Sequence, residues 1–198
     1  MNRAPTRFQA RPPAFSYQES KKGLFRRRSA GSTLHCDDVA LSVLAERFGT
    51  PLYIYSATAI RERMRVFEHA FRKVPHTVCF SVKANSNLGI LRLLSHMGCG
   101  FDVVSGGELQ RVLHVNRRAA KQVVFSGVGK TAEEMKAALK AGILLFNVES
   151  ESELWVLAEC AAGLKQTARI AMRVNPDVAA ETHPYISTGL HQHKFGVP

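Results

Sequence analysis

Beyond residue 75 the sequence repeats one unit, a short apolar run followed by a segment in which apolar residues recur at helical spacing. The apolar runs occupy residues 78–82, 101–104, 123–125, 143–148 and 168–174. Because these runs are continuous rather than alternating, they predict strands that are buried on both faces. Strands of this kind, separated by helical segments, indicate an α/β fold with a parallel sheet or barrel.

Helices are expected between these runs, at residues 88–97, 108–115, 131–140 and 152–162. The third of them begins with a capping box, Thr131-x-x-Glu134, in which each side chain bonds the backbone N–H of the other residue.

The region before residue 75 has its own helix signals. Asp37 or Asp38 is expected to cap a helix that runs through Arg47, and residues 52–55 form a short strand-like run. Ser56 is expected to cap a longer helix over residues 57–73.

Polar residues cluster where the apolar runs end: Lys83, Asp102, Ser126, Asn147 and Arg173. In a (β/α)8 barrel the carboxyl ends of the strands form the active-site face. An open doubly wound sheet also binds ligands at that edge. The pattern therefore locates a site without choosing between the two folds.

The number of units favours an incomplete barrel. A whole (β/α)8 barrel needs eight units and about 250 residues, whereas five units are visible in these 198 residues. We expect residues 36–198 to be a partial barrel domain, with a chain that is cut short at Pro198.

Residues 1–35 are strongly basic, with eight lysines or arginines against one acid, in a chain of net charge +11. Such an arm can bind nucleic acid or anionic membranes. No aromatic pattern or binding motif accompanies the charge. We therefore expect residues 1–35 to be a solvated, disordered extension without a nucleic-acid or membrane partner, and residues 1 to about 33 to be dispensable for folding.

The four cysteines, Cys36, Cys79, Cys99 and Cys160, show no metal-binding spacing, so they are expected to be reduced thiols in a cytoplasmic protein. No apolar stretch is long enough to cross a bilayer, and no secretory signal is apparent.

The segment Ser81-Val82-Lys83-Ala84-Asn85 places a lysine at the end of an apolar run. Lysine is rarely buried without a partner or a purpose. Partial burial makes its amine a nucleophile toward carbonyls, as in Schiff-base lysines. The alternative is a structural lysine whose ammonium group reaches solvent.

This segment resembles the cofactor-lysine motif of the fold-type III decarboxylases that use pyridoxal 5'-phosphate (PLP), which share the alanine racemase barrel. Further stretches are similar to the diaminopimelate decarboxylases, in family order: G-F-D-V-V-S-G-G-E-L from residue 100, V-F-S-G-V-G-K-T from 124, F-N-V-E-S from 146, R-V-N-P-D from 173 and T-H-P-Y-I-S-T-G from 182.

The resemblance implies a role for three residues. Lys83 would carry PLP and act in catalysis, while Asp102 and Arg173 would bind the cofactor. Asp102 could instead cap the turn at residues 105–107, and Arg173 could form an ion pair with Asp177.

Three other motifs are interpreted without a chemical role. His191-x-His193 lacks a third ligand, so no metal site is predicted. His183 is assigned to conformation or an interface as readily as to catalysis. Gly127 and Gly129 lack the spacing of a phosphate loop and are expected to shape a turn.

The resemblance implies that the complete protein is a homodimer that converts meso-2,6-diaminopimelate to L-lysine and carbon dioxide in lysine biosynthesis. The family's later barrel strands and C-terminal β domain have no counterpart in this sequence, so we expect the chain alone to be inactive. Two alternatives remain, a decarboxylase of the same fold for another basic amino acid and a non-catalytic PLP-binding or interaction protein.

Overall fold

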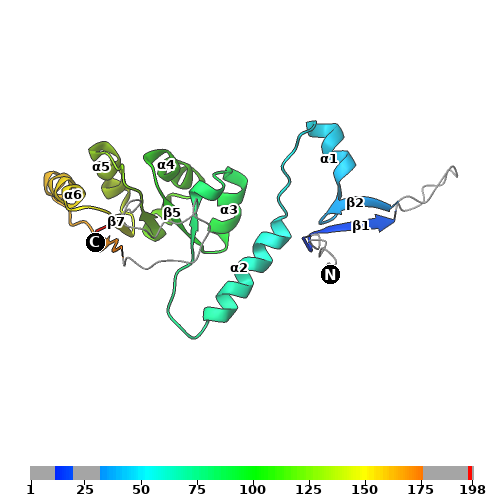
Figure 1. Cartoon of the computed structure of the whole chain (residues 1–198), viewed down its shortest axis with the longest axis horizontal. Helices are drawn as coiled ribbons and strands as arrows, with labels where there is room; N and C mark the ends of the chain where they lie inside the picture. Colours follow the sequence, from blue (N-terminus) through cyan, green and yellow to red (C-terminus); the bar gives the residue numbers. More distant parts are fainter. Residues whose placement is uncertain (1–11, 20–31, 176–195, 198) are drawn as a thin grey trace, which may run out of the picture. The chain divides into compact units, whose positions relative to one another are not determined.

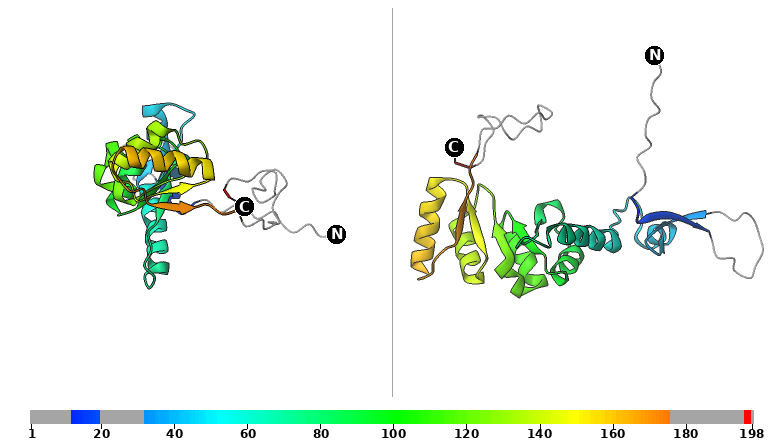
Figure 2. Two further views of the ribbon diagram at one scale, coloured as in Figure 1. Left: turned by 90° about the vertical axis from the view of Figure 1, so that its left-hand side faces the viewer. Right: turned by 90° about the horizontal axis from the view of Figure 1, so that it is seen from below.

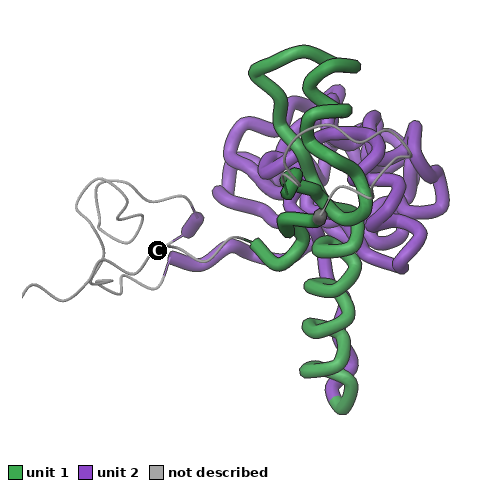
Figure 3. The backbone as a smooth tube through the Cα atoms, turned by 90° about the vertical axis from the view of Figure 1, so that its right-hand side faces the viewer, with its two compact units in different colours: residues 1–73 green, residues 74–198 purple. Residues whose placement is uncertain are grey.

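The computed structural model describes residues 12–19, 32–175 and 196–197. The chain divides into two compact units, residues 1–73 and residues 74–198, which are coloured separately in Figure 3. Each unit is considered by itself below.

The first unit combines a small antiparallel sheet with two helices (Figure 1). Strand β2 (Ser32–Cys36) pairs with β1 (Phe15–Glu19) on one side and with β3 (Val39–Ala40) on the other. The helices are α1 (Leu41–Phe48) and α2 (Ala57–Phe71).

Strand β1 and most of β2 lie inside the range that we expected to lack regular structure. Long-range pairing with the segment around Cys36 stabilises β1, and local sequence patterns do not reveal such a partner. The division into domains at residues 35 and 36 remains a prediction, and residues 1–11 and 20–31 lie outside the described part of the chain.

The predicted cap of α1 is wrong, whereas that of α2 is confirmed. Helix α1 begins only after Ala40, which makes no side-chain cap bond. The Asp37 carboxylate instead accepts hydrogen bonds of 2.7 and 2.9 Å from Ser56 Oγ. Ser56 Oγ in turn accepts from Ala59 N–H and so caps α2. Residues 52–55 pair with no strand and form none.

The second unit is the expected alternation of strands and helices. Its main elements in chain order are β4 (Cys79–Ser81), α3 (Leu88–His96), β5 (Gly100–Val103), α4 (Gly106–Val115), β6 (Val123–Phe125), α5 (Ala132–Ala141), β7 (Leu145–Val148), α6 (Glu151–Gly163) and β8 (Ile170–Met172). Two short 3₁₀ turns, η1 (Val82–Ala84) and η2 (Arg117–Gln122), follow β4 and α4.

Strand order decides between the two folds that the sequence left open. Among the described residues the sheet runs β4-β5-β6-β7-β8, every pair parallel, without the reversal of order that defines a doubly wound sheet. Helices α3 to α6 follow one another along one side of this sheet (Figures 1 and 2). A one-directional parallel sheet with helices on one side is an arc of a (β/α)8 barrel, which confirms the predicted partial barrel.

Side-chain alternation separates an apolar face of the sheet from a partly polar one. Phe101 and Val103 of β5, and their equivalents Phe125 and Phe146 in the next strands, are at most 1% exposed. Asp102 and Asn147, between such residues, are only half-buried. The apolar face therefore packs under the helices, while the other face carries the polar residues.

Helices α3 to α6 each begin with a side-chain cap, and these caps order the turns between the strands and the helices. Ser105, Thr131 and Ser150 each accept a hydrogen bond from the N–H three residues later. The predicted capping box at Thr131 is confirmed. The Glu134 carboxylate accepts from Thr131 N–H at 2.9 Å and from Gly106 N–H at 2.7 Å, and these two backbone N–H groups lower the pKa of its carboxyl.

No helix in the described part of the chain is both long and apolar enough to span a bilayer.

We predict that Gly100→Ala destabilises the second unit by about 1–3 kcal/mol, the usual cost of overpacking. A Cβ at Gly100 would lie 2.5 Å from the Gln122 carbonyl oxygen and 2.9 Å from Cys79 Sγ. Gly129→Ala is the matched control, because nothing lies within 4 Å of a Cβ there. Denaturant unfolding of both variants measures the difference, and equal stabilities would contradict the packing argument.

Candidate active site

Lys83 lies at the carboxyl end of β4, in the 3₁₀ turn η1. Val82 before it is fully buried, whereas Lys83 is exposed. Its ammonium group makes no hydrogen bond or ion pair with any residue that the structure describes. The partial burial expected for a Schiff-base lysine is therefore not observed, because η1 turns the chain out of the sheet directly after Ser81. The amine lies at the predicted edge of the sheet and is accessible.

A row of hydrogen bonds joins the neighbouring strands at the same edge. Asp102 of β5 accepts from Ser81 Oγ of β4 at 3.1 Å and from Ser126 Oγ, just after β6, at 2.5 Å. Asn147 Nδ2 of β7 donates to Ser126 Oγ at 2.9 Å. The row confirms that these strand-end residues meet. The Asp102 carboxylate binds these hydroxyls, while Ser105 caps the turn at residues 105–107. The role of Asp102 in cofactor binding remains a prediction.

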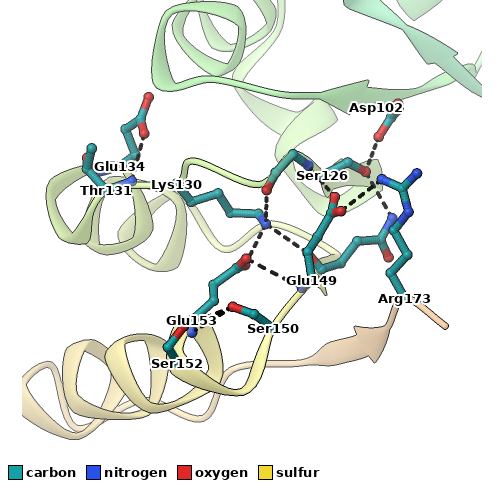
Figure 4. Close-up of polar contacts among 12 residues, drawn as sticks. Asp102, Ser126, Lys130, Thr131, Glu134, Glu149, Ser150, Ser152, Glu153 and Arg173 are labelled. Atoms are coloured by element: carbon teal, nitrogen blue, oxygen red, sulfur yellow. Dashed lines mark hydrogen bonds and ion pairs between the residues drawn. The ribbon is translucent and has the colours of Figure 1, made fainter. Parts of the chain in front are cut away.

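Arg173, the residue after β8, is connected to this row through a buried glutamate. Arg173 Nη1 donates to Glu149 Oε2 at 2.8 Å, and Gly127 N–H donates to Glu149 Oε1 at 2.8 Å (Figure 4). The Glu149 side chain is 2% exposed and that of Arg173 is 46% exposed. Arg173 thus has a buried ionic partner, while Asp177, the partner considered from the sequence, lies outside the described residues.

Lys130 and Glu153 form a second ion pair behind this edge. Lys130 Nζ lies 2.5 Å from Glu153 Oε1, and the lysine side chain is 0% exposed. The same ammonium donates to the carbonyl oxygens of Gly127 at 2.7 Å and Asn147 at 2.8 Å, so all three of its protons have acceptors (Figure 4). The turn after β6 is thereby held by its N–H through Glu149 and by its C=O through Lys130.

Glu149, Lys130 and Glu153 were not predicted as site residues. The signal for Glu149 was its position directly after the apolar run at residues 143–148, the position that Lys83 and Ser126 occupy after their own runs. The Lys130–Glu153 pair spans 23 residues, and no local pattern identifies such a contact. Lys83, by contrast, is adjacent to the row but not hydrogen-bonded to it.

These groups fit pyridoxal phosphate. Attachment of its aldehyde requires an accessible amine, which Lys83 provides. Its negatively charged groups require a cation, and Arg173, whose side chain is partly exposed, suits them. Ser126 and Asn147 supply further hydrogen-bonding groups on the same edge. Among the described residues no cluster of His, Cys, Asp or Glu could hold a metal ion. His183 and His191-x-His193 lie outside the described residues.

Residues 57–198 match the protein family described as "Pyridoxal-dependent decarboxylase, pyridoxal binding domain". The chain therefore belongs to the pyridoxal-dependent decarboxylases, and the predicted cofactor is confirmed.

Within this family the similarity is to diaminopimelate decarboxylases. The sequence is 56% identical to the enzyme of that name from Pseudomonas fluorescens over 168 residues, 84% of this chain and 40% of that protein. It is also 56% identical to the Pseudomonas aeruginosa enzyme over 164 residues, 83% of this chain and 39% of that protein. A crystal structure of M. jannaschii diaminopimelate decarboxylase with L-lysine superposes with a TM-score of 0.76 at 44% identity, covering 83% of this chain and 39% of that one.

The chain thus spans about two-fifths of the length of these relatives.

We predict that Lys130→Met destabilises the second unit by about 3–5 kcal/mol, because it leaves buried Glu153 without its counter-charge. The control is Lys136→Met, which removes an exposed lysine from the nearby helix α5. Thermal and denaturant unfolding measure the loss. Equal stabilities of the two variants would show that the buried pair contributes little.

Proposed function

We propose that this chain is the cofactor-attaching part of a decarboxylase that converts meso-2,6-diaminopimelate to L-lysine and carbon dioxide. The single observation that carries the proposal is the accessible Lys83 amine at the carboxyl edge of the sheet, the edge that also carries Asp102 and Arg173, in a chain 56% identical to diaminopimelate decarboxylases. The L-lysine in the complex with the M. jannaschii relative is the product that this reaction would release.

The residues divide the work in the proposed site. Pyridoxal phosphate, when bound, supplies the electron sink for the bond to carbon dioxide that breaks. Lys83 attaches the cofactor. Asp102, held by two serine hydroxyls, keeps a negative charge in a fixed position at the strand edge. Arg173 binds an anionic group with a guanidinium anchored on Glu149.

The proposal includes a cytoplasmic homodimer. The four cysteines are free thiols in the structure, in keeping with a reducing compartment. The dimer rests on the family resemblance alone. The two other functions considered, a decarboxylase for another basic amino acid and a non-catalytic PLP-binding protein, are outcomes of the second experiment below.

We predict that PLP attaches to Lys83. Borohydride reduction of the chain with PLP, followed by peptide mapping, should place the pyridoxyl group on the peptide that contains Lys83, and Lys83→Ala should remove it. Buried Lys130 should remain unlabelled, because its ammonium protons are all engaged. A pyridoxyl group on Lys130 or Lys194 would overturn the assignment.

We predict that this chain supports decarboxylation when it replaces the matching 39% of the Pseudomonas aeruginosa relative. The chimera should release carbon dioxide from meso-diaminopimelate at least about a hundredfold faster than from L-ornithine or L-arginine, because a site that hydrogen-bonds one substrate rejects analogues that lack the group. The same chimera with Lys83→Ala is the control. A preference for ornithine or arginine would favour the other enzyme, and PLP binding without turnover would favour the non-catalytic protein.

A further inference from the structure

We propose that Glu149 is a positioning residue. Its carboxylate holds the guanidinium of Arg173 in place to bind the anionic groups of the cofactor, and it also fixes the turn after β6. The inference rests on the proposed function for the identity of the ligand. The link between Glu149 and Arg173 itself rests only on the geometry of this chain.

Each oxygen of the Glu149 carboxylate binds a different part of the site. One oxygen accepts from Gly127 N–H and the other from Arg173 Nη1, each at 2.8 Å (Figure 4). Gly127 directly follows Ser126, whose hydroxyl donates to Asp102. A single carboxylate therefore links the residue after β8 to the row of hydrogen bonds that crosses β4 to β7.

The buried carboxylate of Glu149 needs a counter-charge. The residue Glu149 is 5% exposed, and its own N–H donates to the carboxylate of Glu153 at 3.4 Å, so two buried acids lie close together. Burying a carboxylate without a counter-charge is costly. Lys130 offsets Glu153, and Arg173 is the cation in contact with Glu149. The ion pair with Glu149 thus holds Arg173 in place.

Glu149 and Arg173 also differ in how exposed their side chains are. The side chain of Glu149 is 2% exposed, whereas that of Arg173 is 46% exposed. One end of the pair is therefore fixed inside the protein, and the other is partly exposed. A guanidinium anchored in this way loses less conformational freedom when an anion binds, which strengthens binding.

The rival interpretation is that Glu149 only stabilises the turn at Gly127. The two interpretations differ in one respect. If Glu149 acts through Arg173, its loss has no further effect on cofactor binding once Arg173 is gone, so the two substitutions are not additive. If Glu149 serves the turn alone, their effects multiply.

The experiment is a double-substitution cycle in the 198-residue chain with Glu149→Gln, Arg173→Gln and both together. PLP affinity is measured from the absorbance of the lysine-bound cofactor. Glu149→Gln keeps an acceptor for Gly127 N–H and should weaken PLP binding about tenfold or more, as loss of a supporting contact does in other sites. The double variant should bind no more weakly than Arg173→Gln. Affinity of Glu149→Gln within about twofold of the unsubstituted chain, or multiplying effects, would overturn the proposal.

A second readout does not require the cofactor. The NMR order parameter of the Arg173 Nε–H group reports how firmly the guanidinium is held, and it should fall in Glu149→Gln. If the unsubstituted chain attaches no PLP, the proposed function fails, and this order parameter alone decides the positioning role. An unchanged order parameter overturns it.

Two controls separate positioning from folding. Glu159→Gln removes an exposed acid from α6 and should change neither readout. Each variant is also melted. If Glu149→Gln does not unfold cooperatively, Glu149→Asp takes its place, because it keeps the charge but is one methylene too short to reach both partners. It should lower the affinity and the Arg173 order parameter, and unchanged values of both would contradict the inference.

Discussion

The parallel register of strands β4 to β8 is the constraint on which the second unit depends. Phe80 lies beside Phe101, and Phe125 beside Phe146, so residues of one kind line up across the sheet. Because side chains alternate along a strand, one register places the aromatic rows under the helices and the intervening polar residues on the opposite face. A shift by one residue in any strand would bury polar groups and expose phenylalanines. The same register brings the carboxyl ends of all these strands to one edge.

Buried charge is the second organising element of that edge. Removing an ion from water costs several kcal/mol, and a buried pair offsets this only when its remaining hydrogen-bonding groups are satisfied. Lys130 meets the condition with two carbonyl oxygens and Glu153. Glu149 meets it with Gly127 N–H and Arg173. The turn after β6 thus has few alternative conformations, which gives Ser126 and Asn147 at the strand edge a rigid support.

The family and the candidate lysine are predicted from local sequence, and the comparisons confirm the family. The segment around Lys83 and those that begin near Gly100, Val124 and Phe146 all lie in the matched region, residues 57–198. The structure adds the way in which these segments contact one another. Asp102, Ser126 and Asn147 belong to three different motifs, yet they form one continuous row of hydrogen bonds.

The sequence by itself determined the alternation of strands and helices, because continuous apolar runs, helical spacing and capping residues such as Ser56 and Thr131 act over a few residues. It also determined which strand ends carry polar groups. Only the tertiary structure decided between a barrel arc and a doubly wound sheet, since strand order depends on contacts between distant segments. Strand β1, the exposure of Lys83 and the partners of Glu149 were decided there too. Strand β1 and the partners of Glu149 depend on groups 13 or more residues apart, and the exposure of Lys83 depends on the turn after β4, so local sequence patterns do not reveal them.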